Sequence, residues 1–302
     1  MSLTNLLAPM STQDFFGAHW GKKPLFLNGR ADRFRDTPFE LDDMCRRLAT
    51  KPSSVGLKAQ FLDTAGRHCE MPISARQIPL CFDAGMTICA GPLDHLMPAM
   101  REWTRALDHA CGFAGAFAVM SYWSPNGAGF GWHYDEVGVF ICQLRGAKRW
   151  WFSSAPVVDC PREPFVYSPE GLEKLRQQGI EPTAPPRDSE ATSVVLEPGD
   201  LLYLPAGTWH RTEAAGRESL ALTLGATGGG ADQLVTLCLR EWLRRDRSWS
   251  RALPFVDPQQ LARCELPSAV SDELAERLGR LKRYVAELSV RDLARVWARD
   301  SG

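Results

Sequence analysis

The sequence has almost no net charge and no long apolar run, and both absences exclude broad classes of protein. The formal net charge is −1 at pH 7, so nothing indicates general binding to nucleic acid or to a membrane surface. The longest weakly polar stretch, CGFAGAFAVMSYW at 111–123, is too short and too rich in glycine to span a bilayer. The first residues, MSLTNLLAPMSTQDFF, lack a basic segment followed by an apolar run, so no signal peptide is expected.

Closely spaced cysteine pairs are also missing. The nine cysteines are scattered from Cys45 to Cys264 with no CxxC spacing. We therefore expect no disulfide framework and a cytoplasmic location, where thiols stay reduced. His68 and Cys69 are adjacent, but neighbours in sequence rarely bind the same ion, so we do not predict a metal site there.

What the sequence does contain predicts a mainly β fold with helices at both ends. Many short apolar segments separated by Gly and Pro turns occupy residues 113–227, a pattern typical of a jelly roll or barrel. Residues 1–112 mix helical patterns with short extended segments, and residues 228–302 are helical throughout. We therefore predict a jelly-roll core flanked by N-terminal α/β elements and by a C-terminal helical region.

Two helices are predicted before the core. Ser11 and Asp14 have the spacing of a helix-capping pair, and an apolar stripe follows them. Residues 91–111 show the clearest amphipathic pattern in this part of the chain.

Within the core, the pattern predicts a strand over 131–140 and then a hairpin with a tight turn at RGAK, 145–148. Two strands around a Pro-Gly-Asp turn are expected in 192–214, and a last strand in 218–226. The proline-rich residues 153–191 interrupt these strands, and they contain one short helical stretch. A loop of this length is either a functional lid or a solvated excursion.

The C-terminal region carries a regular apolar seam. Leucine or valine recurs every three to four residues at Leu274, Leu278, Leu281, Val285 and Leu288. Ser289 and Asp292 then have the spacing that caps a final helix. The seam fits either packing against the chain's own core or a homodimer interface, and we favour the homodimer because helix-pairing surfaces show such regularity.

The stretch GWHYDEVGVF, residues 131–140, places His133 and Asp135 two positions apart in an otherwise apolar strand. Residues i and i+2 of a strand point to the same face, so the two side chains would project together. Such a pair fits either two metal ligands or a simple ion pair.

A third candidate ligand, His210, lies in LEPGDLLYLPAGTWHRTEA, at the start of a late strand. Two histidines and one carboxylate on one face of a metal leave positions open for other ligands, as non-haem Fe(II) chemistry with O₂ requires. A catalytic zinc could use the same three residues, but no base that would activate its water is evident nearby. Taken alone, His210 would fit a structural histidine at the rim of the barrel whose ring nitrogens are hydrogen-bonded within the protein.

These motifs resemble a known family. SPNGAGFGWHYDEVGVFICQLRGAKRWWF followed by PGDLLYLPAGTWHRTEA is similar to the JmjC branch of the cupin superfamily, and closest to the ribosomal oxygenases. FFGAHWGKKPLFLNG near the N-terminus and FDAGMTICAG at 82–91 are similar to the same group. The resemblance covers roughly residues 12–260. It implies a double-stranded β-helix and an enzyme that uses Fe(II) and 2-oxoglutarate.

The resemblance also implies roles for single residues. His133, Asp135 and His210 match the iron ligands, and Lys148 in RGAKRW matches the basic residue that binds the distal carboxylate of 2-oxoglutarate. Lysine lacks the bidentate fork of arginine and needs a helper hydroxyl, with which Ser124 aligns. From the residues alone, Lys148 and Ser124 also fit exposed positions. Arg145 or Arg149 would replace Lys148 if the strand register shifted by one residue.

The implied reaction is hydroxylation of a side chain in a protein or peptide substrate with O₂. The aromatic residues Trp132, Tyr134 and Trp209, together with 153–191, are candidate walls of the substrate channel, although the tryptophans also fit core packing. Alternatives are the same chemistry on a small molecule or natural-product peptide, lysine demethylation, and a metal-binding cupin without catalysis. Only about 75 residues follow the last strand, too few for the winged-helix domain of larger ribosomal oxygenases.

Overall fold

The structure is a computed structural model that describes residues 1–30, 32–50, 55–64, 66–112, 116–177, 183–227, 230–253 and 255–300. The chain divides into two compact units, Met1–Gly228 and Gly229–Gly302. The predicted boundaries after residues 112 and 227 both adjoin positions outside the described residues, 113–115 and 228–229. No helix in the described part of the chain is long and apolar enough to cross a membrane.

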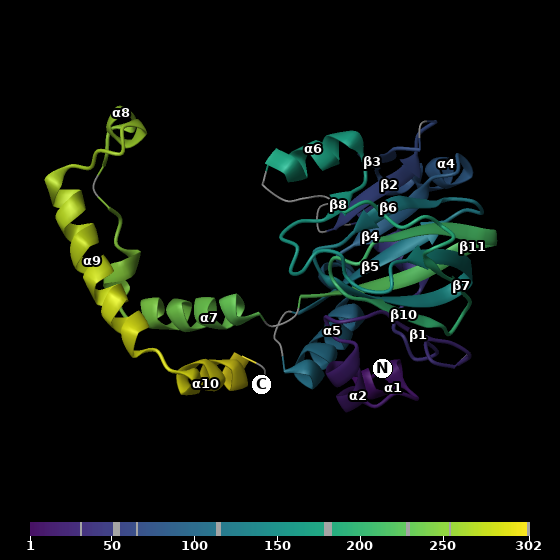
Figure 1. The fold of residues 1–302 in the computed structure, drawn as a ribbon, viewed down its shortest axis with the longest axis horizontal. Coiled ribbons are helices and arrows are strands. Elements are labelled where there is room, and N and C mark those ends of the chain that lie inside the picture. The colour runs from purple at the N-terminus through teal and green to yellow at the C-terminus, as the bar shows by residue number, and fades with distance from the viewer. Residues whose placement is uncertain are drawn as a thin grey trace. The chain divides into compact units, whose positions relative to one another are not determined.

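The first unit is built around one antiparallel sheet (Figure 1). Its strands, in chain order, are β1 (Leu25–Leu27), β2 (Gly56–Leu62), β3 (His68–Pro72), β4 (Thr87–Gly91), β5 (Phe117–Ser124), β6 (Gly129–Tyr134), β7 (Gly138–Phe152), β8 (Phe165–Val166), β9 (Thr192–Leu196), β10 (Leu201–Leu204) and β11 (His210–Ala226). The main path through the sheet is β1-β10-β7-β11-β5-β4-β2-β3, while β6 joins β11 to β8, and β9 pairs with β7. The predicted mainly β class is confirmed.

Two long strands, β7 and β11, form the centre of the sheet and correct the predicted hairpin. RGAK does not reverse the chain, because β7 continues through it and pairs with β11 along nearly its whole length. Gly146 has a φ of +68°, and the register with β11 shifts beside it. A side chain at Gly146 would also meet the Glu218 carbonyl oxygen. The glycine therefore marks a bulge that bends a continuous strand.

The apolar run of β7 is buried on both faces, which explains why it does not alternate with polar residues. Phe140 and Cys142 pack in the larger core cluster with the N-terminal helices. Val139 and Ile141 point the other way, into a second cluster inside the barrel. A strand covered on both sides needs apolar residues at every position.

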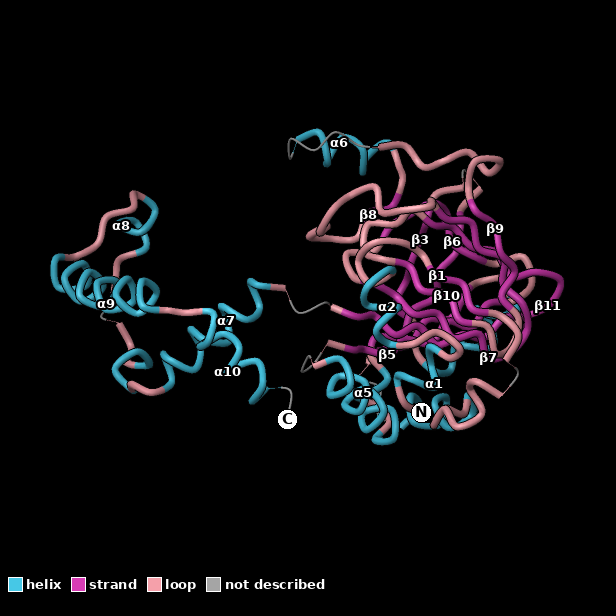
Figure 2. The backbone as a smooth tube through the Cα atoms, turned by 60° about the horizontal axis from the view of Figure 1, so that its bottom comes forward, coloured by secondary structure: helices cyan, strands magenta, loops and turns pink. Residues whose placement is uncertain are grey.

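Helices lie around this sheet. They are α1 (Leu3–Leu7), α2 (Thr12–Ala18), α3 (Leu41–Thr50), α4 (Ile78–Asp83), α5 (Pro98–Cys111) and α6 (Pro169–Gln177), with the short 3-10 helices η1 (Ala75–Gln77) and η2 (Leu93–His95). Figure 2 shows α1 and α5 at one edge of the strand body and α6 at the opposite edge. The predicted cap is confirmed, because the Ser11 hydroxyl accepts a hydrogen bond from the Asp14 amide at 3.0 Å. Helix α5 begins later than predicted, at Pro98, since proline favours the first helical position.

The second unit is helical, as predicted. Its elements are α7 (Ala231–Arg244), the 3-10 helix η3 (Arg247–Ser250), α8 (Pro258–Ala262), α9 (Ser268–Glu287) and α10 (Val290–Asp300). Trp242 of α7 stacks on Tyr284 of α9 with ring centroids 4.7 Å apart, so these helices pack together. The Ser289 hydroxyl accepts a hydrogen bond from the Asp292 amide at 3.3 Å, which confirms the predicted cap.

Candidate metal centre

The three predicted ligand residues come together in the first unit. One ligand atom from each of His133, Asp135 and His210 lies within 4.8 Å of the others. His133 is in β6 and His210 is the first residue of β11, and the sheet register places these two residues opposite each other. Asp135 follows the end of β6, so the prediction that it shares a strand with His133 is wrong. Asp135 instead lies in the turn between β6 and β7, and its carboxylate comes close to His133 from there.

Backbone hydrogen bonds fix which nitrogen of each imidazole is free. His133 Nδ1 lies 2.8 Å from the Gly131 carbonyl oxygen, and His210 Nδ1 lies 2.9 Å from the Thr208 carbonyl oxygen. A carbonyl oxygen only accepts, so both Nδ1 atoms carry a proton and donate it. The lone pair of each Nε2 atom is then available to a metal ion.

Burial keeps both imidazoles neutral. It lowers the pKa of His133 to about 3, with the neighbouring His210 as the second cause, and it lowers the pKa of His210 to about 4. Desolvation also raises the pKa of Asp135. His210 Nε2 is 3.6 Å from Asp135 Oδ2, but a neutral imidazole makes no ion pair there. Two neutral nitrogen donors and an enclosed carboxylate form a donor set that fits a divalent cation.

The turn before His210 is tied to Asp135. Gly207 donates its backbone amide to the Asp135 carbonyl oxygen at 2.9 Å. Its φ is +74°, and a side chain on it would meet the Val158 carbonyl oxygen at 2.0 Å. Glycine therefore allows the turn at 205–208 to approach the segment after β7 closely. This contact helps to fix the positions of Asp135 and His210.

Lys148 and Ser124 also meet. The Lys148 Nζ atom donates a hydrogen bond to Ser124 Oγ at 2.9 Å and lies 5.2 Å from the centre of the Phe130 ring. Lys148 is 2% exposed and Ser124 is fully buried, so the interpretation of both as exposed residues is wrong. Arg145 and Arg149 are exposed and do not line the cavity that contains Lys148. Burial lowers the pKa of Lys148 to about 8.

A cavity of about 150 Å³ connects the three candidate ligands with Lys148. Its other lining residues are Gln60, His68, Tyr122, Phe130, Gly131, Val139, Ile141, Trp150, Val166, Thr212, Ala221 and Thr223. His68 is thus part of the wall, although among the described residues it belongs to no group that could hold a metal ion. Sequence patterns gave no sign of Gln60 or His68 in the wall, because β2 and β3 reach the site only through the sheet.

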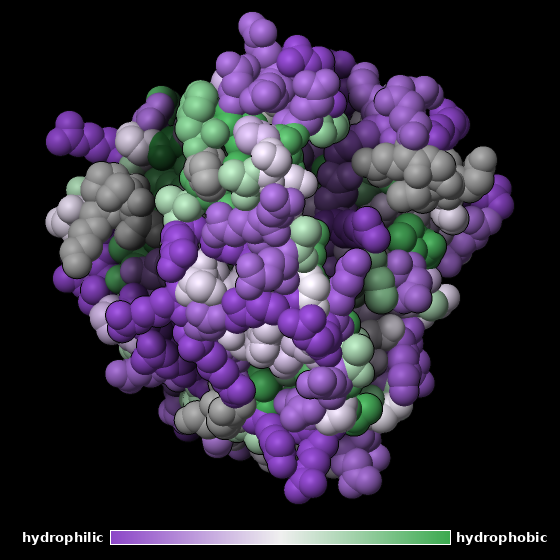
Figure 3. Space-filling model, turned by 90° about the vertical axis from the view of Figure 1, so that its left-hand side faces the viewer, coloured by the Kyte–Doolittle hydropathy of each residue, from purple (hydrophilic) through white to green (hydrophobic). Residues whose placement is uncertain are grey.

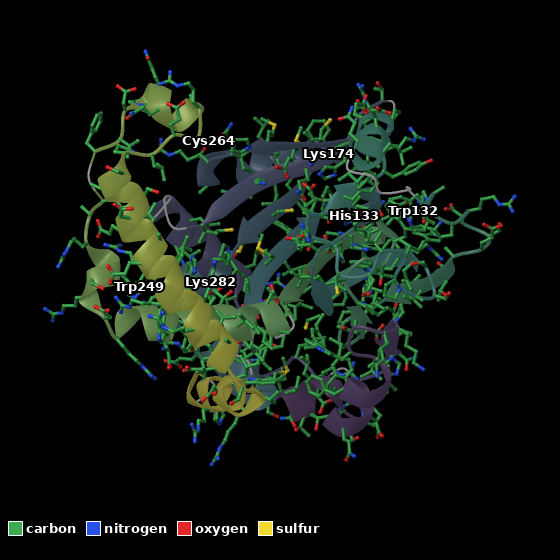
Figure 4. All side chains as sticks on the ribbon, turned by 60° about the vertical axis from the view of Figure 1, so that its left-hand side comes forward. Trp132, His133, Lys174, Trp249, Cys264 and Lys282 are labelled. Atoms are coloured by element: carbon green, nitrogen blue, oxygen red, sulfur yellow. The ribbon has the colours of Figure 1, made fainter. Side chains whose placement is uncertain are left out.

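The aromatic residues predicted to line the channel do not line this cavity. Tyr134 and Trp209 are buried with Phe165 in a separate cluster, and Trp132 packs against it. Tyr134 follows His133 directly, and neighbouring strand residues point to opposite faces. The Trp209 indole donates to the Thr183 carbonyl oxygen at 3.1 Å. Figure 4 labels Trp132 beside His133 in the strand-rich unit. Core packing, the alternative for the tryptophans, describes their positions.

A part of the 153–191 segment packs on the site; residues 178–182 lie outside the description. Strand β8 pairs with β6 and places Val166 opposite His133, where it lines the cavity. Farther along, Asp188 pairs with Arg211, the residue after His210. These contacts favour a functional role for β8 and its surroundings, although most of the other described residues of the segment are exposed, as a solvated excursion would be.

The chain was compared with known proteins. Residues 96–234 match the family described as JmjC domain. The uncharacterized protein YxbC of Bacillus subtilis is 26% identical over 236 residues, which cover 74% of this chain and 69% of YxbC. The protein named ribosomal oxygenase 1 of Homo sapiens is 25% identical over 275 residues. That match covers 83% of this chain but 39% of the human protein, so the chain spans well under half of this relative.

A further relative is the bifunctional lysine-specific demethylase and histidyl-hydroxylase NO66 of Aedes aegypti. It is 37% identical over 229 residues, which cover 72% of this chain and 33% of that protein. The solved structure of YcfD, a ribosomal oxygenase from Escherichia coli in complex with cobalt and 2-oxoglutarate, shares the fold with a TM-score of 0.56 at 19% identity. The alignment covers 90% of this chain and 67% of YcfD.

The likeness in fold confirms the predicted double-stranded β-helix with its flanking helices. The matched model shows that residues 96–234 form a JmjC domain, and the chain is similar over most of its length to proteins named ribosomal oxygenase and histidyl-hydroxylase NO66.

Proposed function

We propose that this protein is an oxygenase that uses Fe(II) held by His133, Asp135 and His210, and 2-oxoglutarate held by Lys148 and Ser124, to hydroxylate a side chain of a protein or peptide. The observation that supports this most directly is that the three ligand groups and the buried Lys148 ammonium face the same cavity.

The donor set supports iron. Two neutral imidazoles and one carboxylate are the ligands of non-haem Fe(II) oxygenases, and they leave positions for a chelating co-substrate and for O₂. When bound, the iron and 2-oxoglutarate supply the activation of O₂ and the transfer of one oxygen atom. The residues of this chain hold the three ligand atoms in place through the Gly131 and Thr208 carbonyl groups and the Gly207 amide.

The surroundings of Lys148 support a dicarboxylate co-substrate. No carboxylate in the described parts of the chain lies within ion-pair distance of its ammonium group. A buried ammonium without a counter-ion is unfavourable, so an anionic ligand would restore its full charge. Lys148 can therefore bind and orient the distal carboxylate while Val139, Ile141 and Trp150 exclude water from the cavity.

The names of the relatives support a protein substrate. One relative is named ribosomal oxygenase and another histidyl-hydroxylase, so we propose hydroxylation of a protein side chain, in the ribosome or elsewhere. A small molecule or natural-product peptide would fit the same metal and co-substrate residues. The nine cysteines are all free thiols, which supports the cytoplasm as the place of action.

The test is Fe(II)-dependent conversion of 2-oxoglutarate to succinate, with ribosomal proteins, peptides and small molecules as candidate substrates. Mass spectrometry then locates the product that has gained one oxygen atom. The exposed His95 gives a matched control, because His95→Ala leaves the cavity unchanged whereas His210→Ala removes a ligand. Conversion that does not need iron, or that survives in His210→Ala, would contradict the proposal.

A further inference from the structure

A buried threonine lies behind the proposed co-substrate residues. Thr87, the first residue of β4, donates a hydrogen bond from its hydroxyl to Ser124 Oγ at 2.9 Å. Both residues are essentially inaccessible to solvent. The sheet register explains the contact, because Ile88 pairs with Trp123 and the next residues on the two antiparallel strands are therefore neighbours.

The hydrogen bonds at Ser124 Oγ determine what this hydroxyl can still do. A hydroxyl oxygen has two lone pairs and one proton. The Lys148 ammonium, which can only donate, occupies one lone pair, and Thr87 occupies the other. With Thr87 as the donor in this pair, the proton of Ser124 is available to a further acceptor, which a ligand carboxylate bound to Lys148 would provide. Lys148 keeps two further protons, because only one of its three is used on Ser124.

Thr87 is the only residue of β4 with a side-chain hydroxyl, and the whole strand is buried. All five residues of the strand are buried, and the last four are Ile88, Cys89, Ala90 and Gly91. Valine would fill the position of Thr87 with nearly the same shape and without the cost of burying a polar group. The hydroxyl makes one hydrogen bond, and that bond is to Ser124.

We propose that Thr87 is a positioning residue that turns the Ser124 hydroxyl into a donor for the distal carboxylate of 2-oxoglutarate. Lys148 and Ser124 then present two donors to one carboxylate, which provides the two-point contact that lysine alone lacks. This inference rests on the proposed function. It adds a residue from β4 that acts through Ser124. Neither of these two residues is among those that line the cavity, but Ser124 Oγ lies 2.9 Å from the ammonium group of Lys148, which lines it, and so within reach of a carboxylate bound there.

The experiment compares ligand binding to the full chain loaded with Mn(II), which does not turn over. Isothermal titration calorimetry gives the dissociation constant for 2-oxoglutarate and for oxalate, which chelates the metal but has no distal carboxylate. Thr87→Val and the smaller Thr87→Ala should weaken 2-oxoglutarate binding by about fivefold to tenfold, as expected for a lost hydrogen bond between neutral groups. Oxalate binding should not change. Thr87→Ser, which keeps the hydroxyl, should bind 2-oxoglutarate like the wild type.

A matched control is Thr104→Val, since Thr104 is also buried but lies in α5. Equal weakening of oxalate and 2-oxoglutarate in Thr87→Val, or failure of Thr87→Ser to restore binding, would show a packing role and overturn the inference. If both Thr87→Val and Thr87→Ala bind 2-oxoglutarate with wild-type affinity, the inference about Thr87 is overturned while the proposed function stands. If the wild type binds oxalate but not 2-oxoglutarate, both the proposed function and the inference about Thr87 are overturned. In turnover, the same variants should raise KM for 2-oxoglutarate and leave kcat at saturation unchanged.

Discussion

The chemistry of the cavity depends on how burial sets the charge of single side chains. His133 and His210 lose their positive charge at neutral pH because desolvation disfavours the imidazolium form. The same effect acts on Lys148, but its pKa of about 8 leaves it mostly protonated at neutral pH. The cavity therefore offers neutral donors to a metal and a positive group to an anion.

Because Lys148 titrates near pH 8, binding of 2-oxoglutarate should depend on pH. The protonated form binds the carboxylate, so affinity should be constant below the pKa and should fall by about tenfold per pH unit well above it. Lys148→Arg should remove this dependence, since arginine stays charged. Lys148→Ala should weaken binding by about a hundredfold while metal binding is retained.

Calorimetric titration of the Mn(II)-loaded protein between about pH 7 and about pH 10 measures this effect. Burial also raises the pKa of the nearby Cys89 thiol, so Cys89 stays neutral and does not contribute to the profile. Arg149→Ala is the control, because this neighbouring cation is exposed. A larger loss in Arg149→Ala than in Lys148→Ala would contradict the assignment.

Asp135 is expected to decide whether the metal is retained. Asp135→Ala removes the single carboxylate of the proposed ligand set and should abolish turnover. Binding to the native state raises thermal stability, so Mn(II) should raise the melting temperature of the wild type and of His95→Ala but not of Asp135→Ala. Differential scanning fluorimetry with and without Mn(II) measures this. Full activity in Asp135→Ala would refute the ligand assignment.

The convergence of the three proposed ligand residues could be predicted from the sequence, whereas the contacts that support the site could not. His133 and Asp135 are close in the chain, and their spacing is visible in a short motif. The contact of Thr87 with Ser124 joins residues 37 positions apart, and nothing local indicates it. Such contacts depend on the register between β4 and β5, which sequence periodicity does not specify.

Among the elements, the core strands were predicted approximately where they lie, but not how they divide and connect. The strand expected over 131–140 is divided between β6 and β7. A glycine between two apolar runs predicts a hairpin by local rules, and Gly146 instead bends one strand. The difference depends on β11, which pairs with β7 on both sides of the bulge and makes a continuous strand more favourable. A local pattern cannot contain the information about this distant partner.

The segment after β7 should be held in place by contacts beside His210. The Arg211 guanidinium pairs with Asp188 and lies 3.7 Å from the centre of the Trp151 ring. Arg211→Ala should therefore increase hydrogen–deuterium exchange of residues 183–191. Arg187→Ala is the matched control, because Arg187 pairs with Glu190 inside the segment itself. Equal exchange in the wild type and Arg211→Ala would show that this pair does not hold the segment.

At the scale of the molecule, the sequence predicted two kinds of structure, and each is found in its own unit. The strand unit buries three core clusters, the first of them shared with the N-terminal helices. The helical unit leaves much of its seam in water, since Leu278 is 52% and Val285 is 50% exposed. On the face that Figure 3 shows, small apolar patches lie among hydrophilic side chains. Exposed leucine and valine in a regular row on α9 are consistent with a surface that a second chain covers.

We therefore expect a homodimer with two-fold symmetry, the commonest form of homo-oligomer, in which α9 lies at the interface. Light scattering at micromolar concentration should give the mass of two chains. Replacing Leu278 and Leu281 with glutamate should give a soluble monomer with unchanged helical circular dichroism, because charged side chains oppose burial of the seam. Leu80→Glu is the control, since Leu80 is an exposed leucine in the strand unit, 71% exposed against 52% for Leu278, and should leave the dimer intact. A wild type with the mass of one chain would rule out the dimer, and loss of helical signal in the double variant would instead place the seam inside a single chain.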